Sequence, residues 1–249
     1  LDQGFADPTK STTIRQLLKG IRTVHNTPEN RARPLELEVL EQVDSWLADG
    51  IERAQHQGDH ASMLRFTRDR SLILLGFWRG FRSDELARLT VENVKIVSSE
   101  GMTCYLDRSK ADRQTLGKTY KCPSLSRLCP VTAFAQWVAL AKLDHGPVYR
   151  GVDRWGHLSS KAMHPNSLIP LLRSMLTTAG VPDVGDYSSH SLRRGFAGWA
   201  NASGWDIKEL MEYVGWTDIK SAMRYLDTPD AELQGRFEQG LEKGSPKNE

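Results

Sequence analysis

Apolar residues recur at helical spacing along most of the chain. The first such segment follows Asp7-Pro8, with apolar residues three or four positions apart at Ile14, Leu17, Leu18, Ile21 and Val24. This spacing predicts an amphipathic helix. The next stretch, residues 26–34, is polar and carries prolines, as linkers often do. We therefore expect residues 1–30 to be the end of an upstream helical domain with its linker, and residues 31–249 to form a second domain.

Helical spacing also dominates this second domain. It predicts helices at residues 35–47, 68–78, 130–142, 165–178, 190–202, 207–213 and 219–226. A further short helix is expected after Arg82, with Ser83 as its N-cap and the carboxylates of Asp84 and Glu85 in its first turn.

Three segments have the composition of strands instead. Residues 91–97, 102–107 and 118–122 are rich in β-branched and aromatic side chains. The polar residues 108–117 join the last two and are expected to form a hairpin tip, whereas the Gly-rich residues 146–160 are expected to be irregular. The predicted fold class is mainly α with one small antiparallel β-sheet (α+β).

The last residues predict a separate helix from about residue 229. Thr228-Pro229-Asp230 interrupts the preceding helix, and Leu233, Phe237 and Leu241 then follow four positions apart. This gives a narrow apolar stripe on an otherwise charged helix. Such a stripe needs a groove to cover it, on its own domain or on a neighbouring copy.

Bulk properties exclude several classes of protein. The 249 residues suffice for a sizeable core. No apolar run approaches the ~18 residues of a membrane span, and the start lacks the apolar region of a signal peptide. Three cysteines are too few for a disulfide framework and no Cys/His spacing resembles a zinc site, so a cytoplasmic protein without a metal or other cofactor is expected.

The formal net charge of +2 indicates no partner, but the charge is unevenly distributed. Between residues 101 and 130, six lysines and arginines oppose two aspartates, and from residue 227 onward six acidic residues oppose three basic ones. A basic middle and an acidic tail suit an anion-binding surface and a protein-binding tail. Ordinary solvated faces explain such an asymmetry equally well.

Five residues in a fixed order carry the candidate chemistry: Arg82 in Gly-Phe-Arg-Ser-Asp-Glu, His190 and Arg193 in His-Ser-Leu-Arg, Trp216 in Val-Gly-Trp, and Tyr225 nine positions later. His190 and Arg193 would project from one helix face. Arginine binds phosphate oxygens with paired, charge-assisted hydrogen bonds and does not deprotonate. A tyrosine has an unperturbed pKa near 10, so as a nucleophile it needs cationic neighbours or a base.

This ordered set resembles the tyrosine recombinases, the family of phage-type integrases and of the Cre and Xer enzymes, over roughly residues 65–245. The resemblance implies the DNA breaking-rejoining catalytic-domain fold. It also implies a metal-independent DNA strand transferase that forms a 3′-phosphotyrosyl intermediate during integration, excision or resolution of mobile DNA. Residues 1–30 would then be the end of the helical core-binding domain that precedes the catalytic domain.

The resemblance assigns a role to the residues of the set. Arg82 and Arg193 would bind the scissile phosphate, and the phenolic oxygen of Tyr225 would attack it. Trp216 stands where many family members carry histidine. Its indole N–H can donate one hydrogen bond to a non-bridging oxygen but cannot shuttle a proton.

Two further positions match the family. Lys110, at the predicted hairpin tip, would protonate the leaving oxygen, because nearby charge and burial can bring the pKa of a lysine towards neutrality. Lys118 and Lys121 are the alternatives for this role. Glu85 would orient the cationic groups, with Asp84 as its alternative.

The implied partner is double-stranded DNA that carries specific recombination sites. The candidate DNA contacts are Lys118, Lys121, Lys161, Asn166, Arg194 and Lys208. The lysines and Arg194 would mainly neutralise phosphates. Asn166, at the start of the helix that would enter the major groove, could pair with adenine; a solvent-facing helix cap explains it equally well. The terminal helix would dock on an adjacent protomer within a DNA-bound tetramer.

Two other functions use the same residues. A type IB topoisomerase shares this chemistry but relaxes supercoils without partner strands. A DNA-binding protein of the same fold could also have lost catalysis, although every chemical group of the set is present. No membrane contact is expected.

Overall fold

The computed structural model describes residues 7, 11–25, 31–97, 100–107, 117–223 and 225. The chain divides into two compact units, Leu1–Arg31 and Ala32–Glu249. The first unit contains helix α1 (Thr12–Val24), at the position that the apolar pattern predicts. Residues 108–116 of the predicted hairpin tip (108–117) lie outside the described residues, and so do Lys110 and the predicted tail helix.

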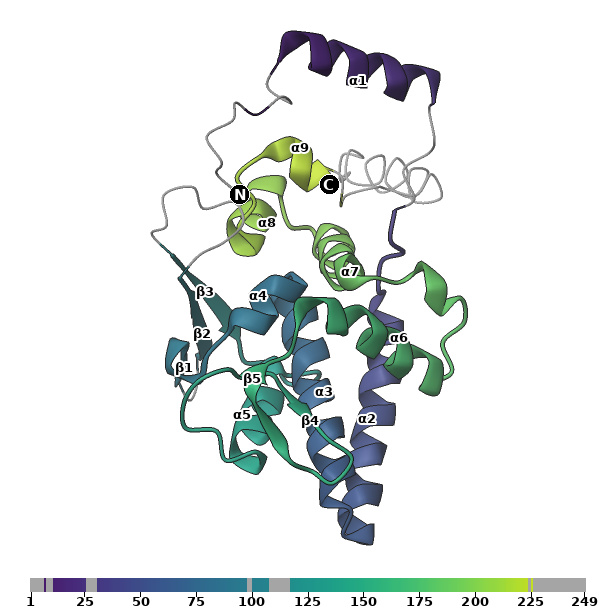
Figure 1. Ribbon diagram of the computed structural model, residues 1–249. Helices are drawn as coiled ribbons and strands as arrows, with labels where there is room; N and C mark the ends of the chain where they lie inside the picture. Colours follow the sequence, from purple (N-terminus) through teal and green to yellow (C-terminus); the bar gives the residue numbers. More distant parts are fainter. Residues whose placement is uncertain are drawn as a thin grey trace, which may run out of the picture. The chain divides into compact units, whose positions relative to one another are not determined.

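The second unit is mostly helical (Figure 1). Its helices are α2 (Leu37–Gln57), α3 (His60–Arg79), α4 (Ser83–Arg88), α5 (Pro130–Leu140), α6 (Leu168–Thr178), α7 (Ser189–Ala202), α8 (Ile207–Val214) and α9 (Ile219–Met223). Short 3₁₀ turns are η2 (Val91–Asn93), η3 (Pro165–Ser167) and η4 (Val184–Asp186). None of the described helices is long and apolar enough to cross a membrane.

Two antiparallel sheets accompany these helices. The first has the order β1 (Val94–Val97), β2 (Gly101–Leu106) and β3 (Lys118–Pro123), with Cys104 of β2 opposite Tyr120 of β3. The second pairs β4 (Arg150–Val152) with β5 (Leu158–Ala162). The fold class predicted from the sequence is confirmed: the unit is α+β and mainly helical.

Residues 146–160 were predicted to be irregular, but they contain β4 and part of β5. The prediction of a single sheet was therefore wrong. The carboxylate of Asp153 accepts hydrogen bonds from the backbone N–H groups of Trp155 and His157, which closes the turn between the two strands. The three residues of β4, next to a register shift, are too few to show the alternation that identifies a strand.

Other predicted boundaries also move. Residues 91–93 form the turn η2 before β1 begins, and the turn η3 precedes α6. Helix α3 begins at His60, eight residues before the predicted start, because the side chain of Asp59 accepts the N–H of Ser62 and caps it. Ser83 is the first residue of α4 rather than its N-cap: Arg82 is the N-cap, and the side chain of Glu85 accepts its backbone N–H.

Helix α3 is the centre of the core. Its residues 71–79 are all buried, and it packs against α2, α5 and α7 (Figure 1). Phe77 and Trp78 of α3 meet Phe196 of α7 edge to face, with ring centroids 6.3 and 6.4 Å apart. Helix α3 thus holds α7 beside its own C-terminal end, where the chain continues to Arg82.

Helix α7 also lies against the backbone that leads into α2. The N–H of Leu35 donates to the carbonyl of Ser191 at 2.9 Å, and a Cβ added to Gly195 would lie 1.8 Å from the carbonyl oxygen of Leu35. Only glycine permits this approach. On the same helix, Gly198 has nothing within 4 Å of an added Cβ.

We therefore predict opposite effects for two Gly→Ala substitutions on α7. Gly195→Ala should lower the free energy of unfolding by about 3 kcal/mol, the upper end of the usual range for an overpacked core, because backbone must move. Gly198→Ala should raise it by roughly 0.5–1 kcal/mol, because only helix propensity changes. Urea unfolding followed by circular dichroism measures both; equal effects would contradict the tight packing of α7 on Leu35.

Candidate active site

The side chain of Glu85 joins two arginines at the end of α3. Glu85 is buried, with 4% of its surface exposed. Oε1 accepts a hydrogen bond from Nη1 of Arg82 at 2.9 Å, and Oε2 accepts the backbone N–H of Arg82 at 2.8 Å. Oε2 also lies 3.5 Å from Nη1 of Arg193. Asp84 instead pairs with Arg88 at 2.8 Å on the exposed side of α4, so Glu85 is the acidic residue that contacts both arginines.

Arg193 of α7 is held from several sides. It is 1% exposed; Nη1 donates to the carbonyl of Gly80 at 2.8 Å and Nη2 to that of Val214 at 3.4 Å. Burial, and secondarily the charge of Arg82, lowers the pKa of Arg193 to about 10, which leaves the guanidinium protonated at neutral pH. The side chain of Arg82 is 28% exposed and remains accessible to a ligand.

Trp216 and Tyr225 form a stacked pair, with ring centroids 5.0 Å apart and planes at 28°. Gly215, at φ 81°, ends α8 in the left-handed conformation and leads the chain to Trp216. The guanidinium carbon of Arg193 lies 5.3 Å from the centre of the Trp216 ring. Arg193 therefore contacts both the Glu85 carboxylate and the aromatic pair.

His190 and the indole of Trp216 complete the cluster. His190, exposed in the first turn of α7, has its ring centroid 6.5 Å from that of Tyr225. Trp216 is 6% exposed, and its Nε1 has no hydrogen-bond partner within the described part of the chain. A buried N–H of this kind is costly unless a ligand accepts it. The structure thus brings Arg82, Glu85, His190, Arg193, Trp216 and Tyr225 together.

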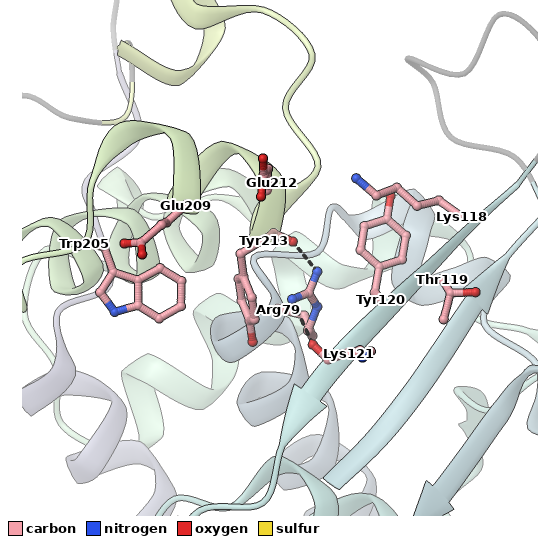
Figure 2. A pocket seen from close by; sticks show the side chains of 9 residues that line it. All are labelled: Arg79, Lys118, Thr119, Tyr120, Lys121, Trp205, Glu209, Glu212 and Tyr213. Carbon is pink, nitrogen blue, oxygen red and sulfur yellow. Dashed lines mark hydrogen bonds between the residues drawn. The ribbon is translucent and has the colours of Figure 1, made fainter. Parts of the chain in front are cut away.

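The candidate DNA-binding residues lie on several elements. Lys118 and Lys121 are exposed on β3 and line a groove of about 580 Å³ between β3 and α8 (Figure 2). Lys161 is exposed on β5, and Asn166 is exposed in η3, where its backbone N–H donates to His164 Nδ1. Lys208 is exposed on α8, and Arg194 is half-buried on α7.

Tyr213 of α8 has a structural position. Its hydroxyl donates to the carbonyl of Trp78 at 2.9 Å, and burial raises the pKa of the phenol to about 12. Both features make it a poor nucleophile compared with Tyr225, which lies among the cationic side chains. Within the described residues, no group of three or more His, Cys, Asp and Glu side chains could hold a metal ion.

Arg79 is a residue that the sequence analysis missed. It is 1% exposed at the end of α3 and lies in the wall of the groove, over the ring of Tyr213 (Figure 2). One signal was available in the sequence. An arginine directly after the apolar run 72–78 must either leave the core or find partners inside it, and no carboxylate lies within four residues of Arg79 in the sequence.

Comparisons with known proteins agree on one family. The phage integrase family matches residues 62–232. The integrase/recombinase XerD homolog of Selenomonas ruminantium is 26% identical over 226 residues, which cover 90% of this chain and 62% of that protein. This chain thus spans less than two thirds of that relative.

Solved structures share the fold at low sequence identity. XerA recombinase has a TM-score of 0.58 at 16% identity, with 92% of this chain and 76% of that chain covered. XerH recombinase bound to a palindromic difH substrate has a TM-score of 0.59 at 17% identity, with 82% and 52% covered. The Tn1549 transposon integrase in complex with transposon right end DNA has a TM-score of 0.59 at 14% identity, with 88% and 69% covered. Because the family match covers more than half of the chain, this protein belongs to the phage integrase family of tyrosine recombinases.

Proposed function

We propose that this protein is a site-specific DNA recombinase that cleaves and rejoins DNA strands through Tyr225. The observation that carries the proposal is the continuous set of contacts from Arg82 through Glu85 and Arg193 to the stacked Trp216 and Tyr225. Two guanidinium groups next to a phenol have the composition that attack on a phosphodiester requires.

The residues divide the work of one transesterification. Arg82 and Arg193 bind the non-bridging oxygens, where negative charge grows in the transition state. The Nε1–H of Trp216, which has no acceptor among the described residues, donates to one of these oxygens. The phenolic oxygen of Tyr225 attacks phosphorus and the bond to the 5′ oxygen breaks. The product is a 3′-phosphotyrosyl link and a 5′-hydroxyl.

Two proton transfers accompany this step. We propose that His190, whose ring centroid lies 6.5 Å from that of Tyr225, accepts the phenolic proton. Lys110 would protonate the 5′ oxygen as it leaves. The number of phosphoester bonds stays constant, so a 5′-hydroxyl can reverse the step without ATP. The arginines supply the charge stabilisation that metal ions supply in other nucleases, so the reaction should need no metal.

DNA with specific recombination sites is the proposed partner. The family, and the solved complexes of XerH and of the Tn1549 integrase with DNA, support this choice. We also propose that residues 1–30 end a core-binding domain and that residues 31–249 form the catalytic domain. The tail helix from about residue 229 would dock on a neighbouring copy in a DNA-bound tetramer, since its apolar stripe needs a cover.

We predict that Tyr225→Phe abolishes covalent capture of DNA and leaves DNA binding nearly unchanged, because only the nucleophilic oxygen is lost. The wild-type protein should form an adduct, in EDTA, with nicked duplexes drawn from a randomised pool. Denaturing gels measure the adduct and gel shifts measure binding.

The matched control is Tyr213→Phe, which removes only a hydroxyl bonded to the Trp78 carbonyl and should retain the adduct. An adduct formed by Tyr225→Phe and lost in Tyr213→Phe would move the nucleophile to Tyr213. DNA binding without any wild-type adduct would leave a catalytically silent DNA-binding protein.

A second prediction identifies the general acid. Lys110→Ala should slow cleavage by about 10²-fold or more, the usual contribution of a proton donor, on an ordinary duplex. A duplex with sulfur at the 5′ bridging position should restore the rate, because a thiolate leaves without a proton. Arg82→Ala should not be restored. Rescue of Lys118→Ala or Lys121→Ala instead would assign the role to that lysine.

A further inference from the structure

Arg79 is a buried cation with no carboxylate partner in the part of the chain that the structure describes. The residue is 1% exposed, and within the described residues no acidic side chain forms an ion pair with it. Burying an unpaired guanidinium is unfavourable unless its N–H groups find acceptors. Nη1 and Nη2 of Arg79 have acceptors, whereas Nε has none among the described residues, so the role of the side chain lies in the two bonds of its Nη groups.

The guanidinium bridges the backbones of two elements. Nη1 donates to the carbonyl of Lys121 on β3 at 3.0 Å, and Nη2 donates to the carbonyl of Tyr213 on α8 (Figure 2). Two aromatic rings pack against the guanidinium group of Arg79. Its central carbon lies 3.8 Å from the ring centre of Tyr213 and 5.0 Å from that of Tyr120. A planar fork can hold two carbonyls at a fixed separation, whereas the single ammonium of lysine cannot fix both.

Both bridged elements lead to the candidate active site. The carbonyl of Val214, next to Tyr213, is bound by Arg193, and the chain then turns through Gly215 to Trp216. Strand β3 lies against Gly215, since a Cβ added there would be 3.1 Å from the ring of Tyr120, and the Tyr120 ring also meets that of Phe81, next to Arg82, at 5.3 Å. Arg79 itself lies three residues before Arg82.

We propose that Arg79 is a positioning residue, which clamps α8 to β3 and so sets the places of Trp216 and Tyr225 relative to Arg82. The proposal rests on the proposed function, because it concerns the same reaction. Arg79 is 1% exposed, and it acts through the two backbone segments that it joins.

The test compares Arg79→Met and Arg79→Lys with Arg68→Met. Arg68 is a matched control, since it is a buried arginine of the same helix and binds Asp69 and the carbonyl of Arg150. At 1.5 Å per residue, it lies about 16 Å from Arg79 along the helix. Cleavage of an excess of nicked duplex is followed under single-turnover conditions. The amplitude reports the fraction of folded, competent protein, and the rate constant reports the chemistry of that fraction.

Arg79→Met should lower the rate constant by on the order of 10²-fold, as a displacement of reacting groups by about 1 Å does, at unchanged DNA affinity. Arg79→Lys should keep the charge but not restore the rate, because the fork is lost. Arg68→Met should reduce only the melting temperature and the amplitude. A wild-type rate constant in Arg79→Met, or full restoration by lysine, would overturn the clamp.

Hydrogen exchange separates this proposal from the proposed function, because it needs no activity. Arg79→Met should speed amide exchange in residues 118–123 and 213–223 by at least about tenfold more than Arg68→Met does, since local opening is no longer opposed by the clamp. Equal acceleration in the two variants would overturn the clamp. If the wild-type protein forms no adduct, the proposed function fails and the exchange result alone decides the role of Arg79.

Discussion

Two guanidinium groups, those of Arg82 and Arg193, approach each other at the end of α3 because the carboxylate of Glu85 lies between them. The two positive charges repel each other: burial, and secondarily the charge of Arg82, lowers the pKa of Arg193. The buried carboxylate offsets that repulsion, and it also accepts the N–H that begins α4. One side chain thus caps the start of α4 and joins the two arginines of the site.

The fold supplies the remaining constraints. Helix α3 presents Gly80, whose carbonyl binds Arg193, and the close packing of Gly195 on Leu35 fixes the helix that carries Arg193. The C-terminal turn of α8 is bound by Arg79 at Tyr213 and by Arg193 at Val214. Two arginines, Arg79 and Arg193, therefore hold the backbone around the site, and the side chain of Arg82 is 28% exposed beside them.

Much of this could be predicted from the sequence where the signal was periodic or ordered. Apolar spacing placed the helices, and the order of Arg82, His190, Arg193, Trp216 and Tyr225 indicated the family, which the comparisons confirm. Short elements could not be predicted, because the three residues of β4 show no alternation.

Hydrogen bonds between side chains and backbone groups could not be predicted either, because they depend on the fold. The N-cap of α4 is Arg82 and not Ser83, because the side chain of Glu85 accepts the backbone N–H of Arg82. Helix-capping propensity favours Ser83 and does not reveal this hydrogen bond. The partners of Arg79 are backbone carbonyl groups 42 and 134 residues away. Every residue has a backbone carbonyl, so the sequence does not indicate which ones Arg79 binds.

The most direct test of this account is the single-turnover rate of adduct formation by Glu85→Gln, with Asp84→Asn as the control. The amide keeps the shape of Glu85 but loses the charge that holds Arg82 and Arg193 together. We expect the rate constant of the folded fraction to fall by on the order of 10–10²-fold, since the arginines lose their orientation towards the phosphate, while DNA affinity holds or rises. Asp84→Asn, which affects only the exposed pair with Arg88, should keep the wild-type rate. A Glu85→Gln protein that forms the adduct at the wild-type rate would contradict the account.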